Sequence, residues 1–484
     1  MLTRLRRRPE LTALGVLLLI GLVLRIYFIF IWRPAITGYS DSGIYFQDAY
    51  QGIWTDPIRT TGYAMFLVVL HWVTPHLLLV IELQHLMGLA VAVLLFATVR
   101  RIGGPRWLGL IPAAAVALGG DELFIEHAAL SETLYILALA AMLYCTVTAW
   151  AGGLRWAVAA GLFAGLSVWI RGAGISLLPV IPLWLLFCRR RPTRATATLA
   201  AISLAAGVAT VGVYVGWRQA SSGLSGLTTN GNWNLYGRVA PWADCTKFTP
   251  PRGAAGLCDP TPPSQRLGRN GGWYIYNPNS PAQKLFGPPY RIASVPGAMD
   301  KLRDFSVAAI ERQPRAYLHA VWLDVIRLVD PNHYSYSDLS ADGLIGFLVG
   351  GPDYHSGRND FVSYWQSLDY PHDSYHRGDI GPLKSWEKLT RFDGAWMIVL
   401  LALCLAAPWV SDGPTRSPAR LLAVVSMVLL LFPLFTKGYD YRYVIPAYGP
   451  LFATASLAGW GIYVRLRRGG IWRRETGRPR RLRA

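Results

Sequence analysis

The apolar run LTALGVLLLIGLVLRIYFIFIW occupies residues 11–32 and decides the fold class. A helix needs roughly 20 mostly apolar residues to cross a bilayer, and this run is long enough. A basic stretch at 4–8 precedes the run, as in a secretory signal peptide, but no small-residue cleavage site follows it. We therefore predict a first transmembrane helix that is retained in the protein.

The composition extends this prediction to the whole chain. Of 484 residues, 52% are hydrophobic and only 15% are charged, and 19 are Trp and 24 are Tyr. This balance is typical of a polytopic membrane protein and argues against a soluble enzyme. We predict an all-α membrane protein with about ten transmembrane helices, at 11–32, 76–99, 106–119, 128–150, 155–170, 173–188, 196–216, 394–410, 419–435 and 443–464.

The net charge of +19 comes from arginines between the apolar runs. Their distribution follows the positive-inside rule, so it indicates topology and not nucleic-acid binding. Both termini are then cytoplasmic, and 465–484 is a basic cytoplasmic tail. The arginine clusters lie at 4–8, 100–106, 155, 189–194, 416–420 and 465–483.

This topology divides the chain into four parts. Residues 1–217 hold the first seven helices and a catalytic external loop at 33–75, in which 62–73 is predicted to be a short interfacial helix. Residues 218–393 form a mixed extracytoplasmic segment, 394–464 hold the last three helices, and the tail follows. In the external segment, Pro pairs at 250–251 and 262–263 predict loops, whereas apolar periodicity predicts helices at 299–310 and 317–328.

Two of the five cysteines lie in the polar external segment. Cys245 and Cys258 are candidates for a disulfide in an oxidising compartment, although spacing alone does not prove a pairing. The other three lie in or beside apolar runs, where core packing is the simpler interpretation.

Ionisable residues collect on the predicted external face, and the first external loop supplies Asp41 and Arg59. Charged groups at membrane depth are costly and face a partner or a polar cavity. The plainer alternative is a lattice of ion pairs between loops, for example Asp41 with Arg59. The remaining residues of this set are Glu122, Glu126, His127, Glu132, Arg171, Lys437, Asp440 and Arg442, with Glu82 and His85 three residues apart in the second helix.

Carboxylates and cations beside a lipid-facing cleft suit sugar transfer from a lipid phosphate. Arg or Lys would stabilise the charge that develops on a phosphate leaving group. A carboxylate would remove the proton of an acceptor hydroxyl. A single base implies inverting displacement, because a retaining mechanism needs a second carboxylate as nucleophile.

Four stretches of this sequence resemble the GT-C superfamily of polyprenyl-phosphate-sugar-dependent glycosyltransferases, especially actinobacterial proteins related to protein O-mannosyltransferases and aminoarabinose transferases. The first begins at Tyr39-Ser40-Asp41-Ser42, with Tyr45, and continues through Arg59-Thr60-Thr61-Gly62-Tyr63. The others are Gln84 to Gly88, Glu126 to Glu132 with Trp169 to Arg171, and Tyr441-Arg442-Tyr443.

The resemblance implies functions for individual residues. Asp41 falls on the family's signature carboxylate and is the implied general base, although Ser42 replaces the second acid of many relatives. The candidates for binding the donor phosphate are Arg59, Arg171, Lys437 and Arg442. Candidates for binding substrate, acceptor or a divalent metal are Tyr45, Glu82, His85, Glu126, His127, Glu132 and Tyr443.

Two other classes remain open. A lipid-linked-saccharide flippase or small-molecule transporter would carry ionisable residues along a through path, often with internal repeats. A membrane acyl- or phosphotransferase would use a positioned histidine, for which His127 is the main candidate. The expected partners of the glycosyltransferase are the bilayer of a bacterial plasma membrane, the lipid-linked sugar, and a glycan, lipid, protein or metabolite acceptor.

Overall fold

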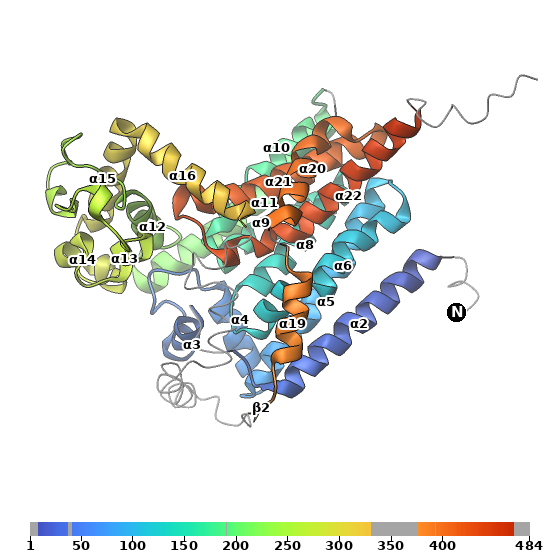
Figure 1. Ribbon diagram of the computed structural model, residues 1–484, viewed down its shortest axis with the longest axis horizontal. Helices are drawn as coiled ribbons and strands as arrows, with labels where there is room; N and C mark the ends of the chain where they lie inside the picture. The colour runs from blue at the N-terminus through green and yellow to red at the C-terminus, as the bar shows by residue number, and fades with distance from the viewer. Residues whose placement is uncertain (1–7, 37–40, 190, 331–375, 393, 469–484) are drawn as a thin grey trace, which may run out of the picture.

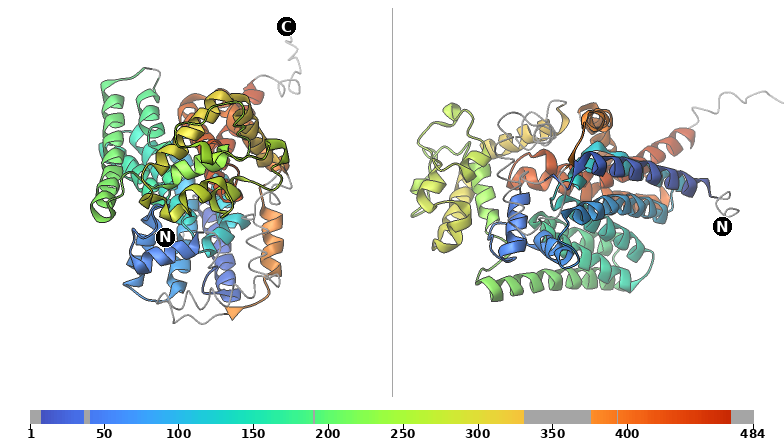
Figure 2. Two further views of the ribbon diagram at one scale, coloured as in Figure 1. Left: turned by 90° about the vertical axis from the view of Figure 1, so that its left-hand side faces the viewer. Right: turned by 90° about the horizontal axis from the view of Figure 1, so that it is seen from below.

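The computed structural model describes residues 8–36, 41–189, 191–330, 376–392 and 394–468. These residues are mostly helical (Figure 1). Long helices run side by side through most of the molecule, and a smaller group of helices lies beyond one end of them (Figures 1 and 2). We call this group, residues 225–330, the cap.

Five described helices are long and apolar enough to cross a membrane, or up to seven if two bent pairs each count as one span. They establish a multi-pass membrane protein. The first four are α2 (Pro9–Ile31), α5 (Leu77–Ile102), α8 (Glu132–Trp150) and α11 (Arg194–Ser222). The fifth is α21 (Arg416–Thr436) with the 3₁₀ turn η7 (Gly413–Thr415) before it.

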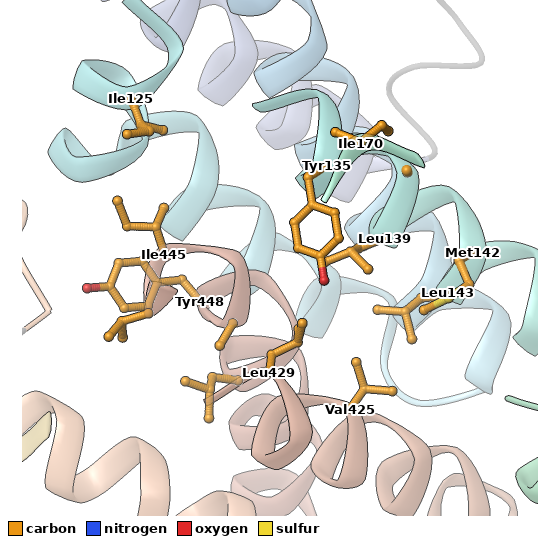
Figure 3. Packing of buried hydrophobic residues seen from close by; sticks show 14 of the residues in the cluster. Ile125, Tyr135, Leu139, Met142, Leu143, Ile170, Val425, Leu429, Ile445 and Tyr448 are labelled. Carbon is orange, nitrogen blue, oxygen red and sulfur yellow. The ribbon is translucent and has the colours of Figure 1, made fainter. Parts of the chain in front are cut away.

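Other helices occupy predicted spans that do not pass this test of length and composition on their own. They include α9 (Leu154–Ile170), and η2 (Gly172–Leu177) with α10 (Val180–Phe187). The last two are α20 (Gly394–Val410), and α22 (Ile445–Arg468) with η8 (Tyr441–Tyr443) before it. In the core, Leu139 of α8 and Leu429 of α21 belong to the same cluster of buried apolar side chains (Figure 3).

The residues between the spans predicted at 106–119 and 128–150 form a buried helix and not an exposed connection. After η1 (Arg106–Gly109) and α6 (Leu110–Leu118), the chain bends by 48° and continues as α7 (Gly120–His127), in which every residue is buried. The bend accommodates α19 (Gly381–Thr390), because a Cβ on Gly120 would lie 2.4 Å from the Cα of Glu387. Only glycine allows the two backbones to approach this closely.

The first predicted external loop contains two helices. The helix expected at 62–73 is present as α4 (Gly62–His71), and α3 (Ser42–Gln51) was not predicted. The strand β1 (Trp32–Arg33) pairs antiparallel with β2 (His376–Arg377). A backbone bridge between Ile36 and Ala128 joins this loop to the segment that precedes α8.

The cap has its own apolar core. The helices of the cap are α12 (Asn230–Val239), α13 (Gly271–Tyr276), α14 (Pro281–Phe286), α15 (Ala298–Arg312) and α16 (Pro314–Val329). Trp233, Tyr236 and Tyr274 are fully buried in it. Cys245 and Cys258 form a disulfide within its loop region. The two helices predicted at 299–310 and 317–328 are present as α15 and α16.

Candidate functional site

Asp41 lies just before α3 in an ion-paired position. Its Oδ1 accepts hydrogen bonds from Arg59, at 2.8 Å from Nε and 2.7 Å from Nη2. Its Oδ2 is 3.5 Å from Nη1 of Arg442. The Asp41 side chain is 23% exposed, so this carboxylate reaches solvent although its partners are largely buried. The Asp41–Arg59 ion pair expected as an alternative is therefore present, within a larger group of charges.

Backbone contacts fix the two ends of this loop against the long helices. The Ile36 amide donates to the His127 carbonyl, and the Ala129 amide donates to the Ile36 carbonyl, both at 3.0 Å. Beyond Arg59, the Thr60 hydroxyl donates to the Ile170 carbonyl at 3.0 Å. A Cβ on Gly62 would lie 2.5 Å from the Trp169 carbonyl oxygen, so this close approach requires glycine.

A second carboxylate, Glu132, connects two of the predicted cations. Its Oε1 lies 2.6 Å from Nη1 of Arg171 and 3.1 Å from Nη1 of Arg442. Glu132 begins α8, Arg171 follows α9 and Arg442 lies in η8, so the site joins segments far apart in the sequence. Arg442 is also 3.7 Å from Asp440. The Tyr45 hydroxyl lies 3.0 Å from the Ser131 hydroxyl beside this group.

Lys437 differs from the three arginines. Arg59, Arg171 and Arg442 are each ion-paired with a carboxylate. Lys437 instead donates a short hydrogen bond to the Tyr443 hydroxyl and forms no ion pair with a carboxylate of the described residues. Its ammonium also lies 4.9 Å from the centre of the Tyr443 ring. Lys437 is therefore the cation with the most capacity left for an anionic ligand.

The electrostatics of the site keep the acid ionised. Burial raises the pKa of Asp41, but Arg59, Arg442 and Lys437 together bring it well below its usual value. Burial lowers the pKa of Lys437, yet the neighbouring tyrosines and Asp440 raise it above its ordinary value. Asp41 is thus an anion and Lys437 a cation at physiological pH.

A cavity of about 520 Å³ opens beside these charges. One wall carries the charged residues Asp41, Arg59, Arg171 and Lys437. The apolar wall includes Tyr135, Ile170, Val428, Leu429, Phe432 and Pro446. The cap closes the remaining side with neutral polar residues, among them Asn230, Asn234 and Tyr276. The cavity therefore combines an apolar region, a cationic region and a hydrogen-bonding region.

Glu126 and two of the other predicted residues belong to a separate buried network. The two carboxylate oxygens of Glu126 each accept a hydrogen bond from Arg25, at 2.7 Å. Glu126 also lies 2.9 Å from Nδ1 of His85, whose Nε2 is 3.0 Å from Nδ1 of His127. His127 is 2.9 Å from the Trp32 carbonyl. None of these side chains lines the cavity.

The network fits poorly with the predicted metal site. Arg25 occupies both oxygens of Glu126, and the backbone occupies one nitrogen of His127. Glu82 is exposed whereas His85 is buried, so these two do not converge on a cavity. In the described part of the chain, no group of three Asp, Glu, His or Cys side chains is arranged to hold a metal ion.

Several residues at the site had no sequence signal. Asn230, Asn234 and Tyr276 come from a segment that differs little from ordinary loop sequence, and the fold alone brings them to the cavity. Arg25 did carry a signal, because an arginine inside an apolar run of this length is expected to have a buried partner. Its partner, Glu126, is 101 residues away in the sequence.

Comparisons with known proteins place the chain near one group of solved structures. No protein-family model matches the sequence, and no curated protein sequence matches it. An oligosaccharyltransferase from Archaeoglobus fulgidus, AglB, in complex with an inhibitory peptide and a dolichol-phosphate, matches with 14% identity and a TM-score of 0.45. The match covers 96% of this chain and 52% of AglB.

Two other structures of the A. fulgidus enzyme give similar values. The complex with Zn and sulfate has 14% identity and a TM-score of 0.45, over 95% of this chain and 51% of the other. The form tethered to an acceptor peptide has 13% identity and a TM-score of 0.47, over 96% and 51%. The chain spans about half the length of these structures. The functional assignment therefore rests on the site.

Proposed function

We propose that this chain is an inverting membrane glycosyltransferase of GT-C type, which transfers a sugar from a polyprenyl-phosphate donor to an acceptor hydroxyl. We place the site on the extracytoplasmic face of a bacterial plasma membrane, with ten spans and both termini cytoplasmic. The single observation that carries the proposal is the cavity, whose lining combines apolar side chains with three cations, Arg59, Arg171 and Lys437, and a solvent-reaching carboxylate, Asp41.

The apolar wall suits the lipid portion of the donor. Val428, Leu429 and Phe432 lie on α21, among the helices that cross the membrane. Tyr135 extends from α8 toward Leu429 of α21 (Figure 3). Burying a prenyl chain against such residues contributes about 25 cal/mol for each Å² of apolar surface removed from water. The lipid would enter from the bilayer with its phosphate toward the charged end.

Lys437 is the primary phosphate ligand in this proposal. The arginines already neutralise Asp41, Glu132 and Asp440, so a bound phosphate must compete with those carboxylates for them. Lys437 requires no such exchange, because a neutral tyrosine is its hydrogen-bond partner. Arg59 is the natural second ligand, since it is partly exposed and lines the same cavity.

Donor binding also makes Asp41 a better base. In the unliganded site the surrounding cations lower the pKa of Asp41, so the carboxylate attracts a proton only weakly. An anionic phosphate beside Lys437 and Arg59 would offset part of their positive charge. The proton affinity of Asp41 would then rise when the donor is present.

The transfer step follows from this arrangement. The acceptor oxygen attacks the anomeric carbon while its proton passes to Asp41. The bond between the anomeric carbon and the phosphate oxygen breaks, and the lipid phosphate leaves with one more negative charge. Lys437 and the nearby guanidinium groups stabilise that charge. One displacement at the anomeric carbon inverts its configuration.

Asn230, Asn234 and Tyr276 are placed to contact the sugar. They are neutral, they line the cavity, and they lie on the cap side of it. Asn230 and Asn234 are four residues apart and so share a face of α12. Amide groups both donate and accept hydrogen bonds, which suits hydroxyl groups on a sugar ring.

A donor panel tests the proposal. Purified protein in bilayer nanodiscs is offered polyprenyl-phosphate sugars that differ only in the sugar, and released lipid phosphate and transferred sugar are measured. We expect turnover of at least one donor by the wild type and turnover about 10²-fold to 10⁴-fold slower by Asp41→Asn. Turnover by both proteins at equal rates, or tight binding of every donor without any turnover, would contradict the proposal.

A further inference from the structure

The outer face of α16 is apolar although it is uncovered in the described structure. Leu318, Trp322, Leu323 and Ile326 are 56%, 59%, 42% and 42% exposed, and they recur at helical spacing along one side. Arg315 and His319 lie at the N-terminal end of the same side. A helix with this pattern in a water-filled environment would expose a continuous apolar stripe.

The opposite face of α16 is tied to the candidate site. Asp324 is 1% exposed, and its Oδ2 accepts hydrogen bonds from Nη1 of Arg238 at 2.6 Å and from the Tyr439 amide at 3.2 Å. Tyr439 lies in the short loop between Lys437 and Arg442. The buried face of the helix is formed by Val321, Asp324 and Leu328, and its one carboxylate holds the site loop, whereas the outer face is apolar and exposed.

The position of α16 is defined by the ends of two apolar helices. It contacts α20 and α21, and the Tyr317 hydroxyl donates to the Phe435 carbonyl at 2.8 Å, one residue before α21 ends. Figure 1 shows α16 crossing toward these helices from the cap. The exposed stripe is thus at the level where α20 and α21 leave the apolar part of the molecule.

The exposed surface of α20, like the stripe on α16, is apolar. Trp396 and Val399, near the beginning of that helix, are 62% and 49% exposed. Exposed tryptophans on spanning helices are typical of the membrane interface, where the ring lies at headgroup level. Trp322 on α16 and Trp396 on α20 carry the same signature on two helices that contact each other.

We infer that α16 is an interfacial helix whose Leu318–Ile326 face lies in the lipid of the leaflet nearest the site. The occupant of this face is the bilayer itself: acyl chains contact Leu318, Trp322 and Ile326, and Arg315 lies toward the headgroups. Such helices bind through buried apolar area and through attraction to anionic lipids. The anchor fixes the height of the cap and the Lys437–Arg442 loop above the bilayer.

Site-directed spin labelling tests this inference. Trp322→Cys and Ile326→Cys are each labelled with a nitroxide in nanodiscs of phosphatidylethanolamine and phosphatidylglycerol. Collision with oxygen, which partitions into lipid, is compared with collision with a water-soluble nickel chelate. We expect high oxygen and low nickel accessibility at both positions. The native free thiols are buried, and label on the unsubstituted protein gives the background to subtract.

Three reference positions define the possible outcomes. Leu19→Cys, on the exposed face of α2, reports lipid; Glu311→Cys, at the exposed end of α15, reports water; and Leu302→Cys, fully buried in the cap, reports a protein interior. Values like those at Leu19 support the inference. Values like those at Glu311 would overturn it, and so would low accessibility to both reagents, which would show that another protein segment or a second copy covers the face.

The substituted proteins need an independent check of folding. Leu318→Cys provides a third label on the same stripe, so the result does not depend on one bulky position. Each labelled protein should retain the size-exclusion profile and thermal stability of the wild type. The experiment does not require turnover, so its outcome stands apart from that of the proposed glycosyltransferase activity.

Discussion

Replacing Lys437 with methionine should weaken use of the donor without unfolding the protein. Methionine preserves most of the apolar stem and removes only the ammonium. In the structure that ammonium donates to the Tyr443 hydroxyl and forms no ion pair with a carboxylate among the described residues. No carboxylate therefore loses its only partner, and the free energy of unfolding should change by less than about 1 kcal/mol.

The loss in catalysis should be much larger than the loss in stability. A charged donor to a developing oxyanion contributes about 10²-fold to 10³-fold in rate. Arg59 lies on the same cavity and retains part of the interaction, so we expect kcat/KM for the donor to fall by about 100-fold. That ratio corresponds to about 2.7 kcal/mol of lost transition-state stabilisation.

The assay measures initial rates of lipid-phosphate release across donor concentrations in nanodiscs, with thermal stability followed in parallel. Tyr443→Phe is the matched control, because it removes the hydrogen-bond partner of Lys437 but leaves the ammonium beside the aromatic ring. It should lose far less activity than Lys437→Met. A folded Lys437→Met protein with kinetic constants within twofold of the wild type would refute the phosphate assignment.

The remaining predictions concern the charges and bonds around the site. Arg442→Met should destabilise the protein by roughly 1–3 kcal/mol in thermal unfolding, because the buried carboxylate of Glu132 loses one of its two arginine partners and keeps only Arg171; an unchanged melting temperature would contradict this. Burial, then the nearby Asp56 carboxylate, raises the pKa of Asp48 to about 8, so the native state holds this proton more tightly and stability should fall between about pH 4 and pH 8. Asp48→Asn should remove that slope, and an identical pH profile in both proteins would refute it. Cys245→Ser should lower the stability of the cap by roughly 3 kcal/mol, and peptide mapping without reductant should find the cross-link to Cys258 only in the wild type.

The sequence was sufficient to predict the apolar helices because length and hydropathy act locally. The runs at 11–32 and 76–99 correspond to α2 and α5, and the pairing of Asp41 with Arg59, 18 residues apart, is present as one expected alternative. These features depend on residues close together in the chain. Rules that use only neighbouring residues can therefore predict these features.

The buried helix α7 could not be predicted in the same way. A run with three acids in seven residues suggests an exposed loop, yet Arg25 makes it possible to bury Glu126. Nothing in either segment alone identifies the other. The same holds for the cavity wall formed by Asn230 and Tyr276, because the fold of the cap decides which of its polar residues face the site.

Transfer by Asp41→Asn most directly tests the central claim that Asp41 is the general base. Asparagine has nearly the same shape and can still accept a hydrogen bond from Arg59, but it cannot take up the acceptor proton. We predict that binding of the donor changes by only a few-fold while the rate of sugar transfer falls by about 10²-fold to 10⁴-fold. Transfer at close to the wild-type rate by the folded variant would contradict the claim.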